Sequence, residues 1–180
     1  MSRKHGLTPC YRKTGEDFLV KANDGNEYQH LVIEFDPDAN GFRLPTESEW
    51  EVACRAGSAT RYYYGSDPKI FSHYGTESSA RYKSCVPAKS LIPNAFGLFE
   101  MHGNIWEWCQ DWYSEIDDTP LTDPRGPDEP DLVSFGRIYR GGGVQSVSGA
   151  TNSAARGSDW PNVRYSNQGF RIARNIDSKH

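Results

Sequence analysis

NAFGLFEMHGNIWEWCQDW, residues 94–112, brings large aromatic rings and acidic side chains together in one short stretch. Three tryptophans fall within seven positions, and four titratable side chains lie among or just before them: Glu100, His102, Glu107 and Asp111. Such a stretch suits a catalytic site, a metal site or an aromatic core with polar decoration. The rest of the sequence has to distinguish these interpretations.

Length and charge limit the classes of protein to which the chain can belong. Its 180 residues predict a single domain over 1–180 with a substantial core. The net charge is −4, and no basic run could follow a phosphate backbone, so nucleic acid is not an expected partner. No run of about 18 apolar residues occurs, so no membrane association is expected. As written, without a signal peptide, the chain is expected to be cytoplasmic, but secreted or periplasmic if an upstream segment is missing.

The four cysteines lack the spacing of a structural zinc site: Cys10, Cys54, Cys85 and Cys109. Free thiols are favoured in a reducing compartment, and two disulfides with any of three connectivities remain open in an oxidising one. With 17 glycines, 11 prolines, 13% aromatic residues and a mean hydropathy of −0.75, the composition predicts a loop-rich domain with a core of large rings.

A helix is clearly indicated in LPTESEWEVACRAG, residues 44–57. Thr46 and Glu49 form a capping box, Gly57 ends the helix, and Trp50, Ala53 and Cys54 give it one apolar face. Elsewhere the patterns predict strands over residues 27–35, 137–143 and 167–174. Mostly loop with short strands is predicted over residues 58–93, and an irregular surface connection over residues 114–136.

Five stretches in series resemble the formylglycine-generating enzyme, or sulfatase-modifying factor, family: FRLPTESEWEVACRAG, PNAFGLFEMHGNIWEWCQDWY, RIYRGGG, SAARG and RYSNQGFRIAR. The resemblance covers residues 42–57 and 93–174. It implies an α+β fold of the unusual C-type-lectin-like kind with little regular structure. Some members oxidise a cysteine to formylglycine with copper(I), others are domains of sulfoxide synthases, and others are non-catalytic ligand-display modules, including hypervariable proteins. Fold alone does not select among them.

Two departures from the enzymes stand out. The resemblance implies two copper-binding thiolates between the glycine run and the AAR motif, yet no cysteine follows Cys109. Ser146 and Ser148 lie near those positions, and a hydroxyl cannot replace a thiolate on copper(I), so copper is not expected. The resemblance also implies a first segment that has no counterpart in this sequence, which predicts uncovered sheet edges and a complementing N-terminal segment or other chain as partner.

The resemblance also implies a calcium site in the opening stretch. Its ligands are the side chains of Glu100 and Glu107 and the backbone carbonyls of Gly103 and Ile105, an oxygen set that suits calcium. Glu100 stands where the family more often has Asp or Asn. The alternative is that Glu107 only hydrogen-bonds backbone amides beside the tryptophans.

Other polar residues are candidates for a groove or its framework. They are Ser146, Ser148, Arg156, Trp160, Asn167 and Arg171. For the two arginines and Asn167, hydrogen bonds that tie the loops to the closing strand are favoured over a role in binding. The run VQSVSGATN with Trp160 is instead a candidate binding surface. His73 and His102 lack a second histidine at ligand spacing, and Asp111 has no nucleophile partner, so none is expected to be a ligand or a base.

Two functions from different classes follow. The first is a non-catalytic binding or accessory module, with a protein or peptide ligand, that has lost the copper–thiolate oxidase site. The second is a protein-modifying oxidase that makes formylglycine on sulfatases once a missing segment or partner supplies the cysteines. A remnant that does not fold alone is a third possibility.

Overall fold

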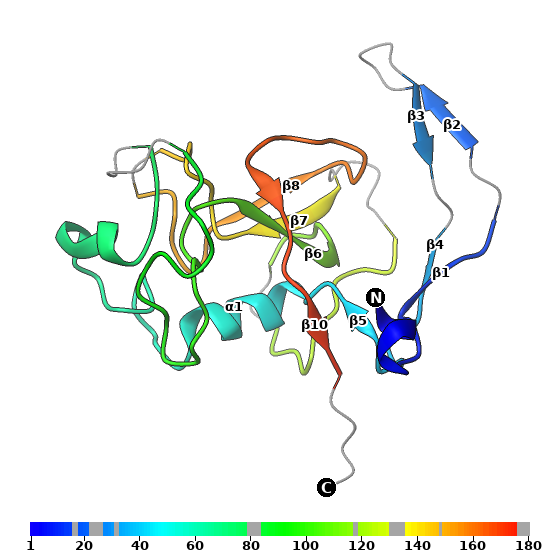
Figure 1. Cartoon of the computed structure of the whole chain (residues 1–180), viewed down its shortest axis with the longest axis horizontal. Coiled ribbons are helices and arrows are strands. Elements are labelled where there is room, and N and C mark those ends of the chain that lie inside the picture. Colours follow the sequence, from blue (N-terminus) through cyan, green and yellow to red (C-terminus); the bar gives the residue numbers. More distant parts are fainter. Residues whose placement is uncertain are drawn as a thin grey trace, which may run out of the picture. The chain divides into compact units, whose positions relative to one another are not determined.

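The computed structural model describes residues 1–15, 18–21, 27–30, 33–78, 84–116, 119–129, 136–147 and 149–175 (Figure 1). The structure forms two compact units, and the single domain over 1–180 stays a prediction from the sequence. One unit is Met1–Leu44 with Ile172–His180, and the other is Pro45–Arg171. The motifs that carry the resemblance lie almost entirely in the second unit.

The first unit consists of short antiparallel strand pairs that follow a 3-10 helix, Ser2–His5. The pairs are β1 (Tyr11–Lys13) with β4 (Ile33–Phe35), β2 (Phe18–Lys21) with β3 (Glu27–His30), and β5 (Phe42–Arg43) with β10 (Ala173–Arg174). The single strand predicted over 27–35 is thus two strands, because β3 and β4 pair with different partners. The closing strand predicted over 167–174 is likewise divided between two sheets.

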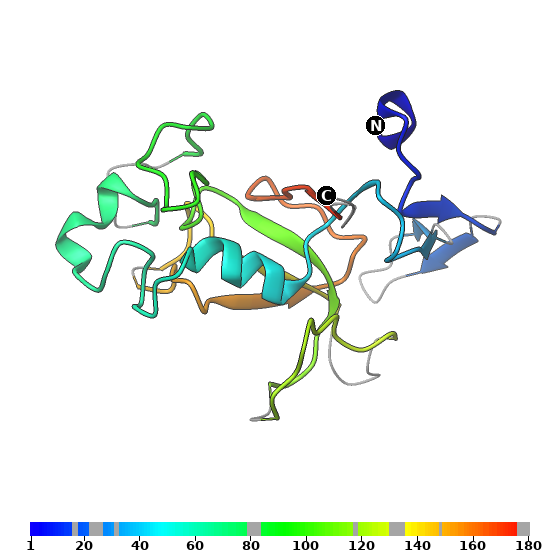
Figure 2. The same cartoon turned by 90° about the horizontal axis from the view of Figure 1, so that it is seen from below.

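A four-stranded sheet with the order β8-β7-β6-β9 forms the centre of the second unit. Its strands are β6 (Trp106–Trp112), β7 (Arg137–Arg140), β8 (Arg156–Asp159) and β9 (Gln168–Gly169). β7 pairs antiparallel with both β6 and β8, while β9 pairs parallel with β6. The helix α1 (Glu47–Arg55) lies along this sheet (Figure 2).

The capping box predicted for α1 is confirmed. The Thr46 hydroxyl accepts a hydrogen bond from the Glu49 amide, and the Glu49 carboxylate accepts one from the Thr46 amide. Trp50 and Cys54 are buried, as the apolar spacing predicts. Ala56, in the left-handed conformation, caps the carboxyl end one residue before the predicted Gly57.

Strand β6 buries every second side chain, and these are not its tryptophans. Glu107, Cys109 and Asp111 are buried, whereas Trp106, Trp108 and the other even-numbered positions are only partly buried. The tryptophans were expected to be the packing element of the core. The structure corrects this, because the alternation of a strand turns the acidic face of WEWCQDW toward α1 and the aromatic face away from it.

The long connections are mostly irregular, as predicted, but the described part of 58–93 lacks the short strands that were expected there. In the described parts of 58–93 and 114–136, regular structure is limited to the 3-10 helix η2 (Pro68–His73) and isolated bridges. Among the described residues, no helix has both the length and the apolar character needed to cross a bilayer.

Candidate functional site

Glu107 lies at the centre of the second unit, 7% exposed, and both of its carboxylate oxygens have partners. The Trp50 indole donates to Oε2 at 2.7 Å. Arg171 forms a two-point ion pair, from Nε to Oε2 at 2.5 Å and from Nη2 to Oε1 at 2.8 Å. The fork of a guanidinium matches a carboxylate in this way, so the pair is both strong and directional. Arg171 is thereby tied to strand β6, and a framework role for it stays a prediction.

Glu100, the other predicted calcium ligand, is 8% exposed and caps a loop. Its carboxylate accepts hydrogen bonds from three consecutive backbone amides, those of Lys89, Ser90 and Leu91, at 2.9–3.2 Å. Glu100 has a φ of 52°, in the left-handed region that non-glycine residues rarely adopt. Backbone amides therefore stabilise this carboxylate where it is buried.

The predicted calcium ligands do not form an open oxygen cage. Glu107 is already neutralised by a guanidinium, and Glu100 is directed at the 89–91 amides. Gly103 has a φ of 89° and lies so close to Thr76 that a Cβ would come within 1.8 Å of the Thr76 carbonyl oxygen. Ile105 is partly buried beside it. A calcium ion would have to displace Arg171 to reach Glu107, so the donor set as arranged does not fit the ion, and calcium remains a prediction from the resemblance.

The turn after the glycine run forms a compact cluster with the start of β6. The Gly143 amide donates to the Ser146 hydroxyl at 2.9 Å, and the Ser146 amide donates to the Gly143 carbonyl at 2.8 Å. A Cβ on Gly143 would lie 3.2 Å from the Trp106 indole and 3.4 Å from the Asn167 amide nitrogen. Ser146 and Asn167, predicted as groove residues, are therefore brought together here. Ser148 lies outside the described residues.

Arg156 and Trp160 lie toward opposite ends of strand β8. The register of β8 places Arg156 opposite Arg140, at the end of β7 that leads into the glycine run, and Asp159 opposite Arg137 at the other end. Trp160 follows Asp159 and is 50% exposed. The predicted groove residues are consequently divided over the two ends of the sheet.

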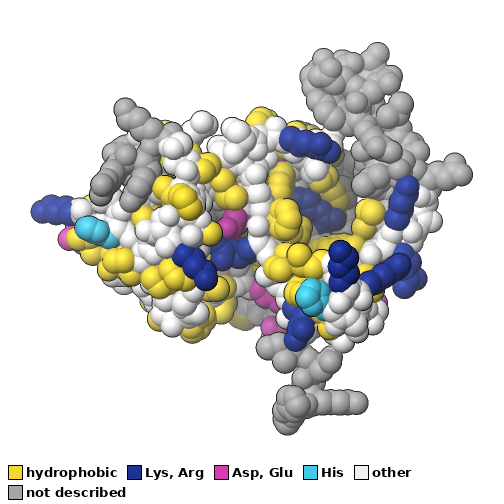
Figure 3. Space-filling view, in the orientation of Figure 1, with side chains coloured by type: hydrophobic (Ala, Val, Ile, Leu, Met, Phe, Trp, Pro, Cys, Tyr) yellow, Lys and Arg dark blue, Asp and Glu magenta, His cyan; other side chains and the backbone are white. Residues whose placement is uncertain are grey.

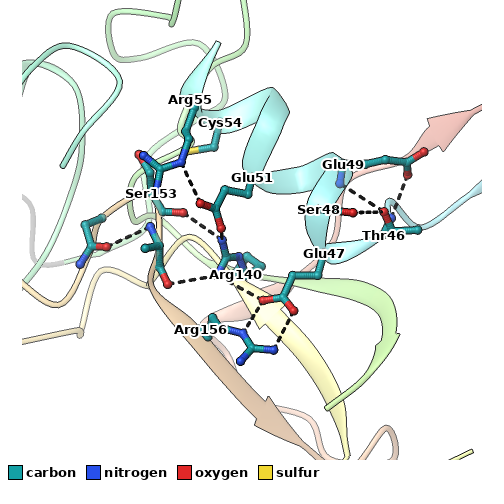
Figure 4. A network of polar contacts seen from close by, with 12 residues as sticks. Thr46, Glu47, Ser48, Glu49, Glu51, Cys54, Arg55, Arg140, Ser153 and Arg156 are labelled. Carbon is teal, nitrogen blue, oxygen red and sulfur yellow. Dashed lines mark hydrogen bonds and ion pairs between the residues drawn. The ribbon is translucent and has the colours of Figure 1, made fainter. Parts of the chain in front are cut away.

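Arg156 and Arg140 anchor a network of ion pairs at the start of α1 (Figure 4). Arg156 contacts both carboxylate oxygens of Glu47 at 2.6 and 2.8 Å. Arg140 is fully buried, lies 3.2 Å from Glu47 and pairs with Glu51. Sequence reasoning missed Arg140, although the alternation of RIYR places it on the same face as the buried Ile138.

Asp111 caps α1 from the neighbouring strand. Its Oδ2 accepts a hydrogen bond from the Glu47 amide at 2.7 Å, an arrangement that the positive end of a helix favours. Burial nevertheless raises the pKa of Asp111 from 3.8 to about 6. Asp111 therefore serves as a hydrogen-bond acceptor at the start of the helix.

The two histidines considered from the sequence occupy different environments. His73 is exposed. His102 is completely buried, and its Nε2 accepts a hydrogen bond from the Tyr63 amide at 3.1 Å while the Tyr63 ring stacks on it at 4.7 Å. Burial lowers the pKa of His102 to about 3, so it is neutral at physiological pH. Neither residue has the surroundings of a metal ligand, and the described residues contain no group of three or more His, Cys, Asp or Glu side chains that could hold a metal.

The buried cysteines are poor candidates for thiolate chemistry. Burial raises the pKa of Cys54 to about 12 and raises that of Cys109 further. All four cysteines are free, Cys85 alone being exposed. A thiolate, not a thiol, is the nucleophile and the metal ligand, so Cys54 and Cys109 act as small apolar core residues.

Known proteins resemble this chain in sequence and in structure. The family model "Sulfatase-modifying factor enzyme 1-like domain" matches residues 12–176. The formylglycine-generating enzyme of Streptomyces coelicolor is 37% identical over an alignment of 155 residues, and the match covers 76% of this chain and 48% of that protein. The serine/threonine-protein kinase pkn1 of Chlamydia pneumoniae is 36% identical over 140 residues, 76% of this chain and 22% of that protein. The solved structure of Treponema denticola variable protein 1 matches with a TM-score of 0.80 and 29% identity, covering 96% of this chain and 64% of that one.

Proposed function

This chain belongs to the sulfatase-modifying factor enzyme 1-like family, and we propose that within this family it is a binding or accessory module without the copper–thiolate oxidase site. The family and the α+β fold predicted from the motifs are confirmed. The chain spans about half the length, or less, of the curated relatives described above. Those relatives carry different activities in their names, so membership alone does not assign one.

The observation that carries the proposal is the absence of cysteine after Cys109. In the segment between the glycine run and the AAR motif, Ser146 stands near the place of a thiolate, and its hydroxyl is used to close a turn on the Gly143 amide. Copper(I) prefers soft sulfur ligands. The three buried cysteines, Cys10, Cys54 and Cys109, are poor substitutes, because burial raises the pKa of each thiol.

The surface that we propose for ligand binding is the turn 143–147 with Trp106 and Asn167. Gln145 and Val147 are exposed on this turn, Val147 to 71%. Hydrophobic side chains also gather at several places on the face shown in Figure 3, where acidic side chains are sparse. Amide, hydroxyl and indole groups beside apolar area are suited to adaptable contacts with a protein or peptide. The solved structure of a variable protein is similar to this chain, and the resemblance counts hypervariable proteins among the ligand-display members of the family.

An activity assay tests the proposal that this chain lacks the oxidase site. The chain is incubated with copper(I), dioxygen and a peptide carrying the sulfatase motif, next to an active formylglycine-generating enzyme as positive control. Mass spectrometry reads conversion of the peptide cysteine to formylglycine. We expect conversion by the control enzyme only, and turnover by this chain would overturn the proposal.

The binding proposal is tested with a peptide-display library. Selected peptides are expected to lose affinity for Val147→Asp and to keep it for Val52→Asp, because Val52 is 65% exposed on α1 and lies outside the proposed surface. Equal loss in both variants, or selection of no peptide, would argue against this surface as the binding site.

A second candidate function is an oxidase that is completed in trans, and the 37% identity to a protein named formylglycine-generating enzyme favours it. A complementing N-terminal segment or another chain would then have to bring the cysteines. Repeating the activity assay with and without such a partner separates the two functions, since only the second requires the partner.

A further inference from the structure

One face of the four-stranded sheet is aromatic and lies opposite the face that packs on α1. Paired residues in a sheet have their side chains on the same face, and successive residues alternate between the faces. The registers that turn Glu107 and Arg140 toward α1 therefore turn their strand neighbours the other way. We call these neighbours the aromatic face, and each of them is partly exposed: Trp106, Trp108, Trp112, Arg137, Tyr139, Gly157, Asp159 and Gln168.

Tyr139 lies at the centre of the aromatic face. Its ring makes T-shaped contacts with the rings of Trp106 and Trp108, with centroids 4.8 and 5.4 Å away. Gly157 on β8 leaves room for this ring, because a Cβ there would lie 2.1 Å from a Tyr139 ring carbon. The Tyr139 ring therefore lies over β8, at the edge of the sheet.

A carboxylate lies near this ring. Asp159 is two residues along β8 from Gly157 and shares its face, and its Oδ1 accepts a hydrogen bond from the Trp160 amide at 2.8 Å. Burial raises the pKa of Tyr139, and the nearby Asp159 and Tyr165 raise it further. Trp160 and Tyr165 are 50% and 55% exposed. The acid therefore lies among aromatic residues at a part of the sheet that a ligand can reach.

Asp159 has no counter-charge of its own. Within the described part of the chain, no basic side chain forms an ion pair with it. Arg137 is its cross-strand neighbour, but the Arg137 guanidinium stacks 3.9 Å from the centroid of the Trp112 ring and donates to the Gln110 carbonyl oxygen on β6. A positive group from a ligand would therefore complement the Asp159 carboxylate, and the rings beside it suit a cation as well.

A second acceptor lies on the other side of the rings. Gln168 on β9 pairs in register with Trp106, and its buried amide oxygen has no hydrogen-bond partner among the described residues. Buried acceptors in native proteins nearly always have a donor, from the protein itself, from water or from a ligand. The aromatic face thus offers one acceptor on each side of Tyr139, and both favour a ligand that carries donors.

We propose that Asp159 and the Tyr139 ring form a subsite for the cationic side chain of a peptide partner. A guanidinium or ammonium group can donate to the carboxylate while its apolar stem or its plane lies on the ring. This subsite rests on the proposed binding function, because Trp106 belongs both to the aromatic face and to the surface proposed for peptide binding. An extended peptide that contacts the turn 143–147 can follow the sheet to Asp159.

Titration of the isotope-labelled full chain with N-acetyl-arginine amide tests the subsite, with the tryptophan indole N–H signals in NMR spectra as the readout. We expect saturable shifts with the native chain. Asp159→Asn is expected to weaken binding about tenfold, because the charge-assisted hydrogen bond is lost. N-acetyl-citrulline amide has nearly the same shape without the charge, and we expect it to bind the native chain about tenfold more weakly than the arginine compound.

Two further variants complete the test. Asp128→Asn removes an exposed acid of the same unit and changes the net charge equally, so it is expected to leave the affinity for N-acetyl-arginine amide unchanged. The asparagine of Asp159→Asn can still accept the hydrogen bond of the Trp160 amide, so the variant is expected to fold. If it does not, Asp159→Ser takes its place, because a hydroxyl can accept the same bond.

The subsite is overturned if N-acetyl-arginine amide causes no saturable shift, if Asp159→Asn binds it as tightly as Asp128→Asn does, or if the citrulline compound binds as tightly as the arginine compound. The proposed peptide binding fails separately. If the display library selects no peptide while arginine amide binding still depends on Asp159, peptide binding fails and the cation subsite stands. If selected peptides lack basic residues and bind Asp159→Asn unchanged, the subsite fails and peptide binding stands.

Discussion

Replacing Arg140 by methionine is expected to lower the free energy of unfolding by about 3–5 kcal/mol. The guanidinium is fully buried, and its Nη1 lies 3.2 Å from a carboxylate oxygen of Glu47. At an effective dielectric constant of about 20, that separation corresponds to an attraction of about 5 kcal/mol, which desolvation of both groups largely offsets. The net loss therefore depends on which groups are left without a partner.

Several partners lose a donor together. The carbonyl oxygens of Ser153 and Ala154 accept from Arg140 at 3.0 and 3.1 Å, and each costs about 1–3 kcal/mol if it is left buried and unsatisfied. The two carboxylates keep other arginines, because Glu47 retains Arg156 and Glu51 retains Arg55. Methionine keeps most of the side-chain volume, so the loss is mainly polar.

Urea unfolding followed by tryptophan fluorescence measures the change in the free energy of unfolding. In thermal unfolding, the melting temperature should fall by about 10 °C. Arg55→Met is the matched control. Arg55 pairs with the same Glu51 carboxylate, but its side chain is 28% exposed, so its loss should cost less than about 1 kcal/mol. If Arg140→Met costs no more than Arg55→Met, the reasoning from burial is wrong.

Three further predictions concern the backbone and two buried titratable groups. Gly103→Ala should destabilise the chain by about 2 kcal/mol more than Gly57→Ala. Both glycines have a φ of 89°, but only at Gly103 would a Cβ lie against a backbone oxygen. Urea unfolding midpoints measure the difference, and equal losses of stability would refute the steric argument. His102 has its pKa lowered from 6.5 to about 3, so the unfolded chain binds a proton that the native chain does not, and stability should fall as pH drops through that window. His102→Gln should flatten this loss in unfolding titrations over the same pH range. Asp111 has its pKa raised from 3.8 to about 6, so the native chain keeps a proton that the unfolded chain loses. Stability should therefore fall as the pH rises from about 4 to about 6. An unchanged slope of stability against pH in Asp111→Asn would contradict this.

Parts of the candidate site could be predicted from local sequence patterns. The capping box at Thr46 was predictable because both of its partners lie within one helical turn. The alternation of WEWCQDW also carried a readable signal, since a period of two places Glu107, Cys109 and Asp111 on one face. Composition suggested instead that the tryptophans would be the buried side chains. The energetic reason for the opposite choice lies in α1 and Arg171, which supply polar partners for the acidic face.

Long-range pairing explains what the sequence could not reveal. Arg156 meets Glu47 across 109 positions, and Arg171 meets Glu107 across 64. Neither contact leaves a local sequence pattern. Both arise only when strands that are distant in the chain pair beside α1. The resemblance predicted Glu107 as a calcium ligand, but it could not show which positive group the fold brings to that carboxylate.

The sequence by itself determined the family, the capped helix and the absence of cysteines after Cys109, because each of these is a matter of residue type and short spacing. Only the tertiary structure decided what the buried carboxylates do. Glu107 is paired with an arginine, Glu100 with backbone amides and Asp111 with the start of a helix. A buried charge takes its role from whichever donor the packing places within hydrogen-bond distance, and that placement depends on the whole fold.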